Sequence, residues 1–322
     1  MNCSPSAREL RLMAADAGAA RLGIAAAGTV DPEAAAIYDR WIAAGHHASM
    51  TYLERYADIR LSPQLLLPGT RTLLVCAFPY YTDEPLRLPI ALYARGRDYH
   101  EVVRERLLQL SQAVTSRWGG ETRACVDTAP LRERYWAVRS GLGFTGINNQ
   151  LIVPGIGSYV FIGTLLWTVG VTPDNPCSDR CMQCMRCVSA CPAGAINPDG
   201  SAIRAERCLS YLTIEHRGDL PPDTDLCGHL YGCDECQRVC PHNTTVTPTP
   251  IADFHSGEDL RNLDTDALAT LTPEKFNAIF RHSAVRRTKL TGLRRNLHAI
   301  LGNQPRDTDF FGSHTAFSFK IK

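Results

Sequence analysis

The spacing of apolar and polar residues predicts a mixed α and β architecture for the first half of the chain. Residues 99–118 place valine and leucine at helical intervals beside a charged face at 104–106, which predicts an amphipathic helix. The apolar run 70–81 predicts a buried strand. The other elements predicted are an alanine-rich helix capped by Ser4 and reaching to about Gly23, a strand at 124–127, a helix at 130–139, and strands at 150–153 and 158–167. We therefore expect an α/β or α+β domain at 1–168.

Two further regions differ from the first in pattern. Residues 169–248 are rich in cysteine, proline and glycine, which favours short turns over long helices. Helical spacing returns at 264–271, 273–281 and 291–301. The third region, 249–322, is thus predicted to be a small α-helical extension.

Eight cysteines between 181 and 240 form two runs, each of which ends in Cys-Pro. This is the paired spacing of proteins that hold two [4Fe–4S] clusters, in which the last cysteine of each run crosses to the other cluster. One predicted ligand set is Cys181, Cys184, Cys187 and Cys240, and the other is Cys191, Cys208, Cys233 and Cys236. The region at 169–248 is therefore predicted to be a ferredoxin-like electron-transfer domain.

Disulfides and zinc are the alternatives for so many cysteines. A disulfide framework suits small secreted proteins, whereas 322 residues with 44% hydrophobic composition can bury a core unaided, and we find no secretory signal segment. Zinc accepts Cys-x2-Cys pairs, but four closely spaced thiolates occur here twice. The other five cysteines are predicted to be ordinary thiols: Cys3, Cys76, Cys125, Cys177 and Cys227.

The charge balance is almost even, with 34 basic and 33 acidic side chains, and no apolar stretch has the length of a membrane span. We expect a soluble cytoplasmic protein. One C-terminal segment is nevertheless basic, with no acidic residue among its cations: Arg281, Arg286, Arg287, Lys289, Arg294 and Arg295. A polyanion-binding surface and an ordinary solvated face both remain open for this segment.

Two polar clusters in the first region have the character of an active site. Asp127 follows a predicted strand and precedes a helix, where active-site groups are often presented. The same position suits an aspartate that only caps the helix. The segment 95–100 begins a helix, where its donors suit a phosphate or an amide. His100 considered alone is better interpreted as a capped or core histidine than as a catalytic one.

Several motifs in order along the chain resemble those of the epoxyqueuosine reductase family. They are YARGRDYH at 93–100, VDTAP at 126–130, GLGF at 141–144, GSY at 157–159, CLSYLT at 208–213 and YGCDECQ at 231–237. The similarity runs from about residue 50 to Asn303 and includes SA at 283–284 and RN at 295–296.

This resemblance implies a cobalamin-dependent enzyme that reduces epoxyqueuosine to queuosine at the wobble position of tRNA. The implied cofactors are cobalamin without its dimethylbenzimidazole on cobalt (base-off) and two [4Fe–4S] clusters. The family's proton donor falls on Asp127, which we expect to be protonated in the complex. The partners implied are the tRNA anticodon stem-loop and an external electron donor, with a monomeric protein and no membrane.

The family motifs also suggest contacts to cobalamin. The predicted contacts are Arg60, Tyr99, His100, Asp127, Ser158 and Ser210, with the backbone near Leu151 and Ile162 beside the nucleotide tail. Ile147 departs from the family pattern, which has lysine before Asn148. Many relatives continue into HEAT-like helical repeats, whereas this chain runs into a tail at 304–322.

Two other functions compete with this one. A reductive dehalogenase-like enzyme also pairs a corrin with two clusters, but it acts on a small molecule and usually carries an export signal. A ferredoxin-type carrier needs only the cysteine region, and it leaves the first 168 residues without a purpose.

Overall fold

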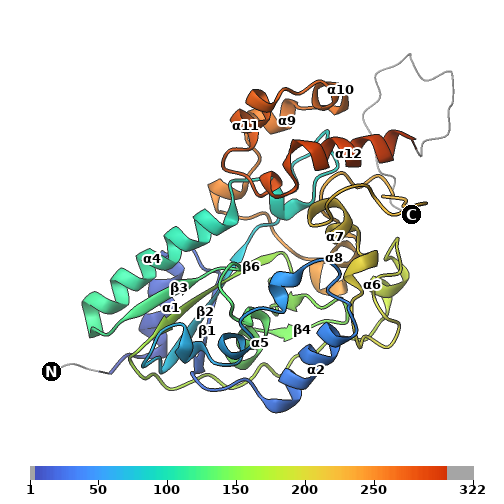
Figure 1. Ribbon diagram of the computed structural model, residues 1–322. Coiled ribbons are helices and arrows are strands. Elements are labelled where there is room, and N and C mark those ends of the chain that lie inside the picture. The colour runs from blue at the N-terminus through green and yellow to red at the C-terminus, as the bar shows by residue number, and fades with distance from the viewer. Residues whose placement is uncertain (1–3, 303–322) are drawn as a thin grey trace.

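A four-stranded antiparallel sheet forms the centre of the computed structural model, which describes residues 4–302 (Figure 1). The strands are β1 (Arg21–Ala26), β2 (Thr72–Pro79), β6 (Val160–Trp167) and β3 (Thr122–Cys125), in that spatial order. Every neighbouring pair is antiparallel, so the fold is α+β and the α/β alternative is excluded. β2 lies inside the sheet and is buried over almost its whole length, as its apolar sequence predicts.

The two faces of the sheet are covered by different helices. Helices α1 (Ala7–Asp16) and α4 (Tyr99–Trp118) pack on the face that carries Leu74, Cys76 and Phe78. Helix α5 (Glu133–Arg139) and the turns around it pack on the opposite face, against Leu73 and Val75. The alternation along β2 follows the two-residue period of a strand, and α4 has the bounds that its sequence predicts.

The remaining elements are short. The helices are α2 (Pro32–Ala43), α3 (Ala57–Leu61), α6 (Arg186–Ser189), α7 (Leu209–Ile214), α8 (Glu235–Arg238), α9 (Glu258–Asn262), α10 (Thr265–Ala269), α11 (Pro273–Phe280) and α12 (Lys289–Gly302). Strands β4 (Phe144–Thr145) and β5 (Leu151–Ile152) form a small hairpin. The cysteine region holds the short helices α6, α7 and α8 and two 3-10 helices, Ala205–Arg207 and Pro241–Asn243, in keeping with its turn-rich composition.

The three predicted regions share hydrophobic cores. One core joins Leu88 and Ile90, before α4, to Tyr231 in the cysteine region and to Phe280 and Leu293 near the C-terminus. Figure 1 shows α9 to α12 beyond the N-terminal end of α4. The backbone N–H of Asp98 at this end donates to the carbonyl of His282 at 2.6 Å. The boundaries at 168 and 248 remain a prediction, but the regions do not pack independently.

The prediction at the N-terminus is wrong in two respects. The helix ends at Asp16, and residues 21–26 form β1. Its cap is Ser6, whose hydroxyl accepts the Glu9 N–H at 3.2 Å, and not Ser4. Alanine tolerates both conformations, and burial of Leu22 and Ile24 against β2 selects the strand. Helix α2 has no counterpart in the prediction.

Cys3, Asn303 and the tail at 304–322 lie outside the described residues. Within residues 4–302, no helix combines the length and apolar character needed to cross a bilayer.

Asn296 ties α12 to the cysteine region and is fully buried. Its amide donates to the carbonyls of Thr213 at 2.8 Å and Leu230 at 2.9 Å. Asn296→Ala leaves both buried carbonyls without these donors, so we expect the free energy of unfolding to fall by about 2 kcal/mol. Urea denaturation measures it against Asn262→Ala, a change at an exposed position. Equal stability of the two variants would refute this role for Asn296.

Candidate active site

The first turn of α4 presents Tyr99 and His100. Asp98 caps the helix, and its carboxylate accepts the His100 backbone N–H at 3.0 Å. The same carboxylate oxygen lies 2.7 Å from His100 Nδ1. The cap that begins the helix therefore also orients the imidazole.

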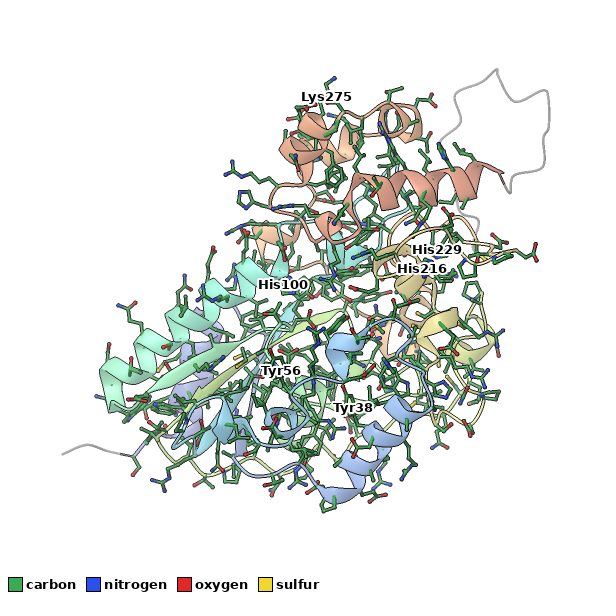
Figure 2. All side chains as sticks on the ribbon, in the orientation of Figure 1. Tyr38, Tyr56, His100, His216, His229 and Lys275 are labelled. Carbon is green, nitrogen blue, oxygen red and sulfur yellow. The ribbon has the colours of Figure 1, made fainter. Side chains whose placement is uncertain are left out.

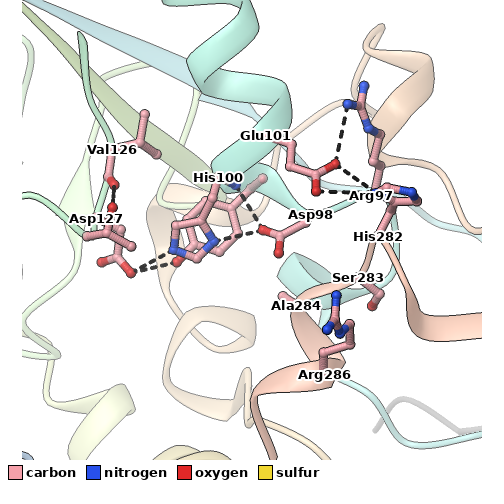
Figure 3. Close-up of polar contacts among 12 residues, drawn as sticks. Arg97, Asp98, His100, Glu101, Val126, Asp127, His282, Ser283, Ala284 and Arg286 are labelled. Carbon is pink, nitrogen blue, oxygen red and sulfur yellow. Dashed lines mark hydrogen bonds and ion pairs between the residues drawn. The ribbon is translucent and has the colours of Figure 1, made fainter. Parts of the chain in front are cut away.

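The segment before α4 is fixed by the chain that leads to the C-terminal helices. A Cβ at Gly96 would collide with the backbone of Phe254, so only glycine permits this approach. The next residue, Arg97, donates its backbone N–H to the Asp253 carbonyl at 2.7 Å. The His282 ring lies 3.1 Å from the carboxylate of Glu101 (Figure 3). The predicted polar segment at 95–100 is thus held from outside its own domain.

Asp127 lies in a tight turn just after β3, not in the strand as predicted. Its φ is +48°, in the left-handed region that a residue with a side chain rarely adopts. The Thr128 N–H donates to the Val126 carbonyl across this turn. The N–H of Asp127 itself donates to Glu133 Oε1, at the start of α5, at 2.9 Å.

The turn brings the Asp127 carboxylate to Tyr99 and His100, and Figure 3 shows its contact with His100. One oxygen, Oδ2, accepts the Tyr99 hydroxyl at 2.9 Å and lies 3.1 Å from His100 Nε2. The Tyr99 ring stacks on Phe161 of β6, with centroids 4.4 Å apart. His100 is therefore held between two carboxylates, and three predicted site residues meet at one oxygen atom (Figure 2 places His100 in the whole molecule).

The electrostatics of this group favour an ion pair. Burial acts to lower the pKa of His100, but hydrogen bonds to Asp127 and Asp98 outweigh it and raise that pKa to about 9. Burial acts to raise the pKa of Asp127, yet the hydrogen bond and charge of His100 hold it below its usual value. In the protein alone the imidazole therefore holds the proton, and the protonation of Asp127 in the complex stays a prediction. Burial and Asp127 keep the Tyr99 hydroxyl protonated by raising its pKa.

The carboxyl of Asp127 is crowded by neighbouring protein atoms but remains accessible, because its side chain is 60% exposed. Beside it, burial and the Asp127 charge raise the pKa of Glu133 to about 8. Arg134 is likewise surrounded by protein yet exposed. Two separate cavities, of about 550 and 300 Å³, are lined by none of the predicted site residues.

Several cysteines of each predicted set lie near enough to affect one another's pKa, and the crossed ligand sets stay a prediction. Burial raises the pKa of Cys240, and the sulfurs of Cys181 and Cys184 act on it from nearby. Burial likewise raises the pKa of Cys187, and the same two sulfurs raise it further. Cys240 from the second run thus lies with the first run.

The second set gathers around Cys208. Burial is the main cause of the raised pKa of Cys208, and the Cys191 sulfur raises it further. Burial also raises the pKa of Cys236, with smaller contributions from Cys233 and Cys208. Within residues 4–302 no three His, Cys, Asp or Glu side chains converge on a single metal-ion site. A [4Fe–4S] cluster asks for a wider ring, since its four thiolates bind different irons.

The other predicted cobalamin contacts are less directly placed. Ser158 is buried, where its hydroxyl donates to Gln237 at 3.0 Å and accepts from Asn243 at 2.9 Å. This arrangement favours a structural role, joining β6 to the cysteine region. Ser210 lies 3.5 Å from the Cys233 carbonyl, and Arg60 donates to the carbonyls of Tyr52 and Arg55.

The apolar members of the predicted set lie in the strands. Leu151 is in β5, and Ile162 in β6 pairs with Ala77. Ile147, at the family's lysine position, lies against Gly200 of the cysteine region, so an apolar contact stands where the family has a charge. Sequence reasoning missed Glu133, whose only signal was an acidic residue at the start of the helix after Asp127.

The basic segment uses many of its donors inside the protein. Arg287 forms a two-point ion pair with Glu215, at 2.9 and 2.7 Å. Arg294 donates to the Leu271 carbonyl at 2.7 Å, and Arg295 donates to three backbone carbonyls of the cysteine region. Arg281 and Lys289 are exposed.

Two family models match the chain. Residues 60–128 match "Epoxyqueuosine reductase QueG, DUF1730", which spans Asp127 and the start of α4. Residues 180–243 match "4Fe-4S double cluster binding domain", which spans all eight cysteines of the two runs. The catalytic and cysteine regions are thus matched separately.

Curated relatives extend the match over most of the chain. The epoxyqueuosine reductase of Leadbetterella byssophila is 36% identical over 300 residues, which cover 90% of this chain and 96% of that protein. That of Aliivibrio fischeri is 35% identical over 319 residues, covering 95% and 85%.

Solved structures agree with this match. The crystal structure of epoxyqueuosine reductase with an epoxyqueuosine-modified tRNA-Tyr stem loop has a TM-score of 0.82 at 30% identity, covering 91% of this chain and 80% of that one. The Bacillus subtilis epoxyqueuosine reductase, with its catalytic aspartate loop swung out of the active site, has a TM-score of 0.79 at 29% identity, with the same two coverages.

Asp127 raises the pKa of His100, so Asp127→Asn should lower that pKa from about 9 toward the usual value of an imidazole. NMR titration of histidine ring nitrogens measures it, with His100→Gln assigning the signal. Asp39→Asn, on the exposed face of α2, is the matched control and should leave His100 unchanged. An unaltered pKa in Asp127→Asn would contradict the ion pair.

Proposed function

Because this chain belongs to the epoxyqueuosine reductase family, we propose that it reduces epoxyqueuosine to queuosine at the wobble position of tRNA, with Asp127 as proton donor. The observation that carries the catalytic assignment is the meeting of Tyr99, His100 and Asp127 at a single carboxylate oxygen of an exposed side chain. A group that can receive and pass on a proton thus faces the space where a substrate can enter.

The tRNA anticodon stem-loop is the proposed substrate. Support comes from the related structure that contains an epoxyqueuosine-modified stem loop, of which this chain covers 80%. Exposed Arg281 and Lys289 are the members of the basic segment best placed to contact phosphates, since their neighbours bond within the protein. The electron donor and the monomeric state remain predictions.

Cobalamin is proposed to bind beside the exposed carboxyl of Asp127. The residues present suit such a group, because Tyr99, His100 and Asp127 lie together there and the Asp127 side chain is accessible. When bound with its base off the metal, cobalamin supplies a strongly reducing cobalt centre. Arg60 and Ser210 remain candidate contacts, whereas Ser158 is better explained by its buried hydrogen bonds.

Two [4Fe–4S] clusters are proposed as the electron path. The proposed ligands are Cys181, Cys184, Cys187 and Cys240 for one cluster, and Cys191, Cys208, Cys233 and Cys236 for the other. Support comes from the electrostatic influence of neighbouring cysteines on one another within each set, and of Cys187 on Cys236 between the sets. Neighbouring clusters pass single electrons readily, which suits a reaction that needs two.

The reaction removes the epoxide oxygen as water and leaves a carbon–carbon double bond, so it consumes two electrons and two protons. Asp127 delivers a proton to the epoxide oxygen as the carbon–oxygen bond breaks. Before that, His100 holds the proton at Nε2, 3.1 Å from Asp127 Oδ2, and Asp98 stabilises the imidazolium from the other side. Tyr99 fixes the same carboxylate oxygen. A second proton reaches Asp127 through the same imidazole.

The Bacillus subtilis structure supports an acid carried on a loop with two positions, since its catalytic aspartate loop is swung out of the active site. In this chain Asp127 lies in the inward position, bonded to His100 and Tyr99. A small-molecule dehalogenase and a simple electron carrier are both less consistent with membership of this family.

The reconstituted protein, with cobalamin and a strong reductant under anaerobic conditions, should convert epoxyqueuosine in tRNA to queuosine. Asp127→Asn should retain clusters and cobalamin but slow this conversion at least about 100-fold, because the amide cannot donate the required proton. Mass spectrometry of the nucleosides measures both, with Asp266→Asn on α10 as control. Unchanged epoxyqueuosine with fully loaded wild-type protein would refute the function, and full activity of Asp127→Asn would refute only the acid.

The crossover can be tested by iron content. Cys184→Ala and Cys240→Ala should each remove about half of the iron, and the double variant should lose no more than either one. Combining Cys240→Ala with Cys233→Ala should instead remove nearly all of it, because these residues serve different clusters. Cys177→Ala, outside both sets, is the control. The reverse pattern of double variants would show that each run serves its own cluster.

A further inference from the structure

The turn that carries Asp127 is strained. Asp127 has a φ of +48°, and the Thr128 N–H closes onto the Val126 carbonyl around it. A non-glycine residue in this region costs about 1 kcal/mol or more, so the surroundings must supply what holds it there.

Two separate sets of contacts hold Asp127. Its side chain is held by Tyr99 and His100, both from α4. Its backbone is held by Glu133, whose Oε1 accepts the Asp127 N–H at 2.9 Å. Of these, the backbone contact is the one that fixes the turn itself, whatever the carboxyl binds.

Glu133 is well anchored for this task. It is the first residue of α5, and the following residues Trp136 and Ala137 are buried in the core against the sheet. The carboxyl group is partly buried, so it does not swing freely in solvent. The hydrogen bond therefore ties the turn after β3 to a helix that cannot move without disturbing the core.

An ordinary helix-capping role does not explain this bond. A first-turn glutamate stabilises its own helix through the dipole, or by accepting the N–H of the capping residue. The capping residue of α5 is Arg132, whereas Glu133 accepts the N–H of Asp127, which is not part of the helix. The contact stabilises the turn.

We propose that Glu133 is a positioning residue that latches the Asp127 turn inward, with the carboxyl against His100 and Tyr99. Without the latch, the strained turn relaxes and carries the carboxylate away from His100 and Tyr99. The proposal rests on the proposed function for its catalytic consequence, but the latch itself is a property of the protein alone.

Hydrogen–deuterium exchange of the peptide that contains residues 126–129, in the cluster-loaded protein, tests the latch directly. Glu133→Ala removes the acceptor and should speed exchange of this peptide about fivefold, the effect of losing one hydrogen bond. Glu133→Gln keeps an oxygen at the same place and should exchange like the wild type. Glu33→Ala, in the first turn of α2, is the matched control for loss of a glutamate side chain at the start of a helix.

Turnover gives the second readout. The single-turnover rate on epoxyqueuosine tRNA should fall by about the same factor in Glu133→Ala, with tRNA affinity unchanged, and should recover in Glu133→Gln. If Glu133→Ala does not fold, Glu133→Asp replaces it, since the shorter side chain keeps a carboxyl group but withdraws the acceptor. Exchange of residues 126–129 in Glu133→Ala or Glu133→Asp equal to that of the wild type would overturn the latch, even if the enzyme is active. A wild-type protein without turnover would overturn the function and leave the exchange result standing.

Discussion

The imidazole of His100, held between the carboxylates of Asp98 and Asp127, is the interaction on which the arrangement of the site depends. Asp98 begins α4, and Asp127 follows β3, so this chain of three groups links both elements. The backbone N–H of Asp98 also donates to the His282 carbonyl, which brings in the C-terminal helices. A cation between two anions is stable only while all three stay in place. Proton chemistry and the docking of the C-terminal region are therefore linked through one short segment.

The sequence predicted those parts of the structure that depend on local pattern. The periodicity of α4 and the continuous apolar run of β2 indicated their positions, whereas the two cysteine ligand sets stay a prediction from spacing. It failed where the outcome depends on distant contacts. β1 forms from an alanine-rich stretch because β2 pairs with it, and the direction of pairing decides between α/β and α+β.

The candidate site shows the same division. Asp127 and His100 stand in recognisable motifs, so they were predicted, but the sequence did not indicate that His100 holds the proton in the protein alone. That assignment depends on a distance across the fold that no local pattern contains. Glu133 was missed for a similar reason, since it contributes through a backbone N–H. Ser158 is the opposite case. It lies in a family motif, but its hydroxyl forms buried hydrogen bonds that join the segment before β6 to the cysteine region.

In the basic segment, net charge and free hydrogen-bond donors are different quantities, although a count of cations in the sequence does not distinguish them. Arg294 and Arg295 donate to neutral carbonyls, so their hydrogen-bonding groups are used while their charges remain. Arg287 is different, because Glu215 neutralises it. A polyanion approaching this surface is attracted by the uncancelled charge over about 10 Å at moderate salt. Directed contacts to phosphates then depend on side chains with free donors, such as exposed Lys289. The segment thus carries more charge than it has free donors, because part of its hydrogen bonding holds the C-terminal helices to the cysteine region.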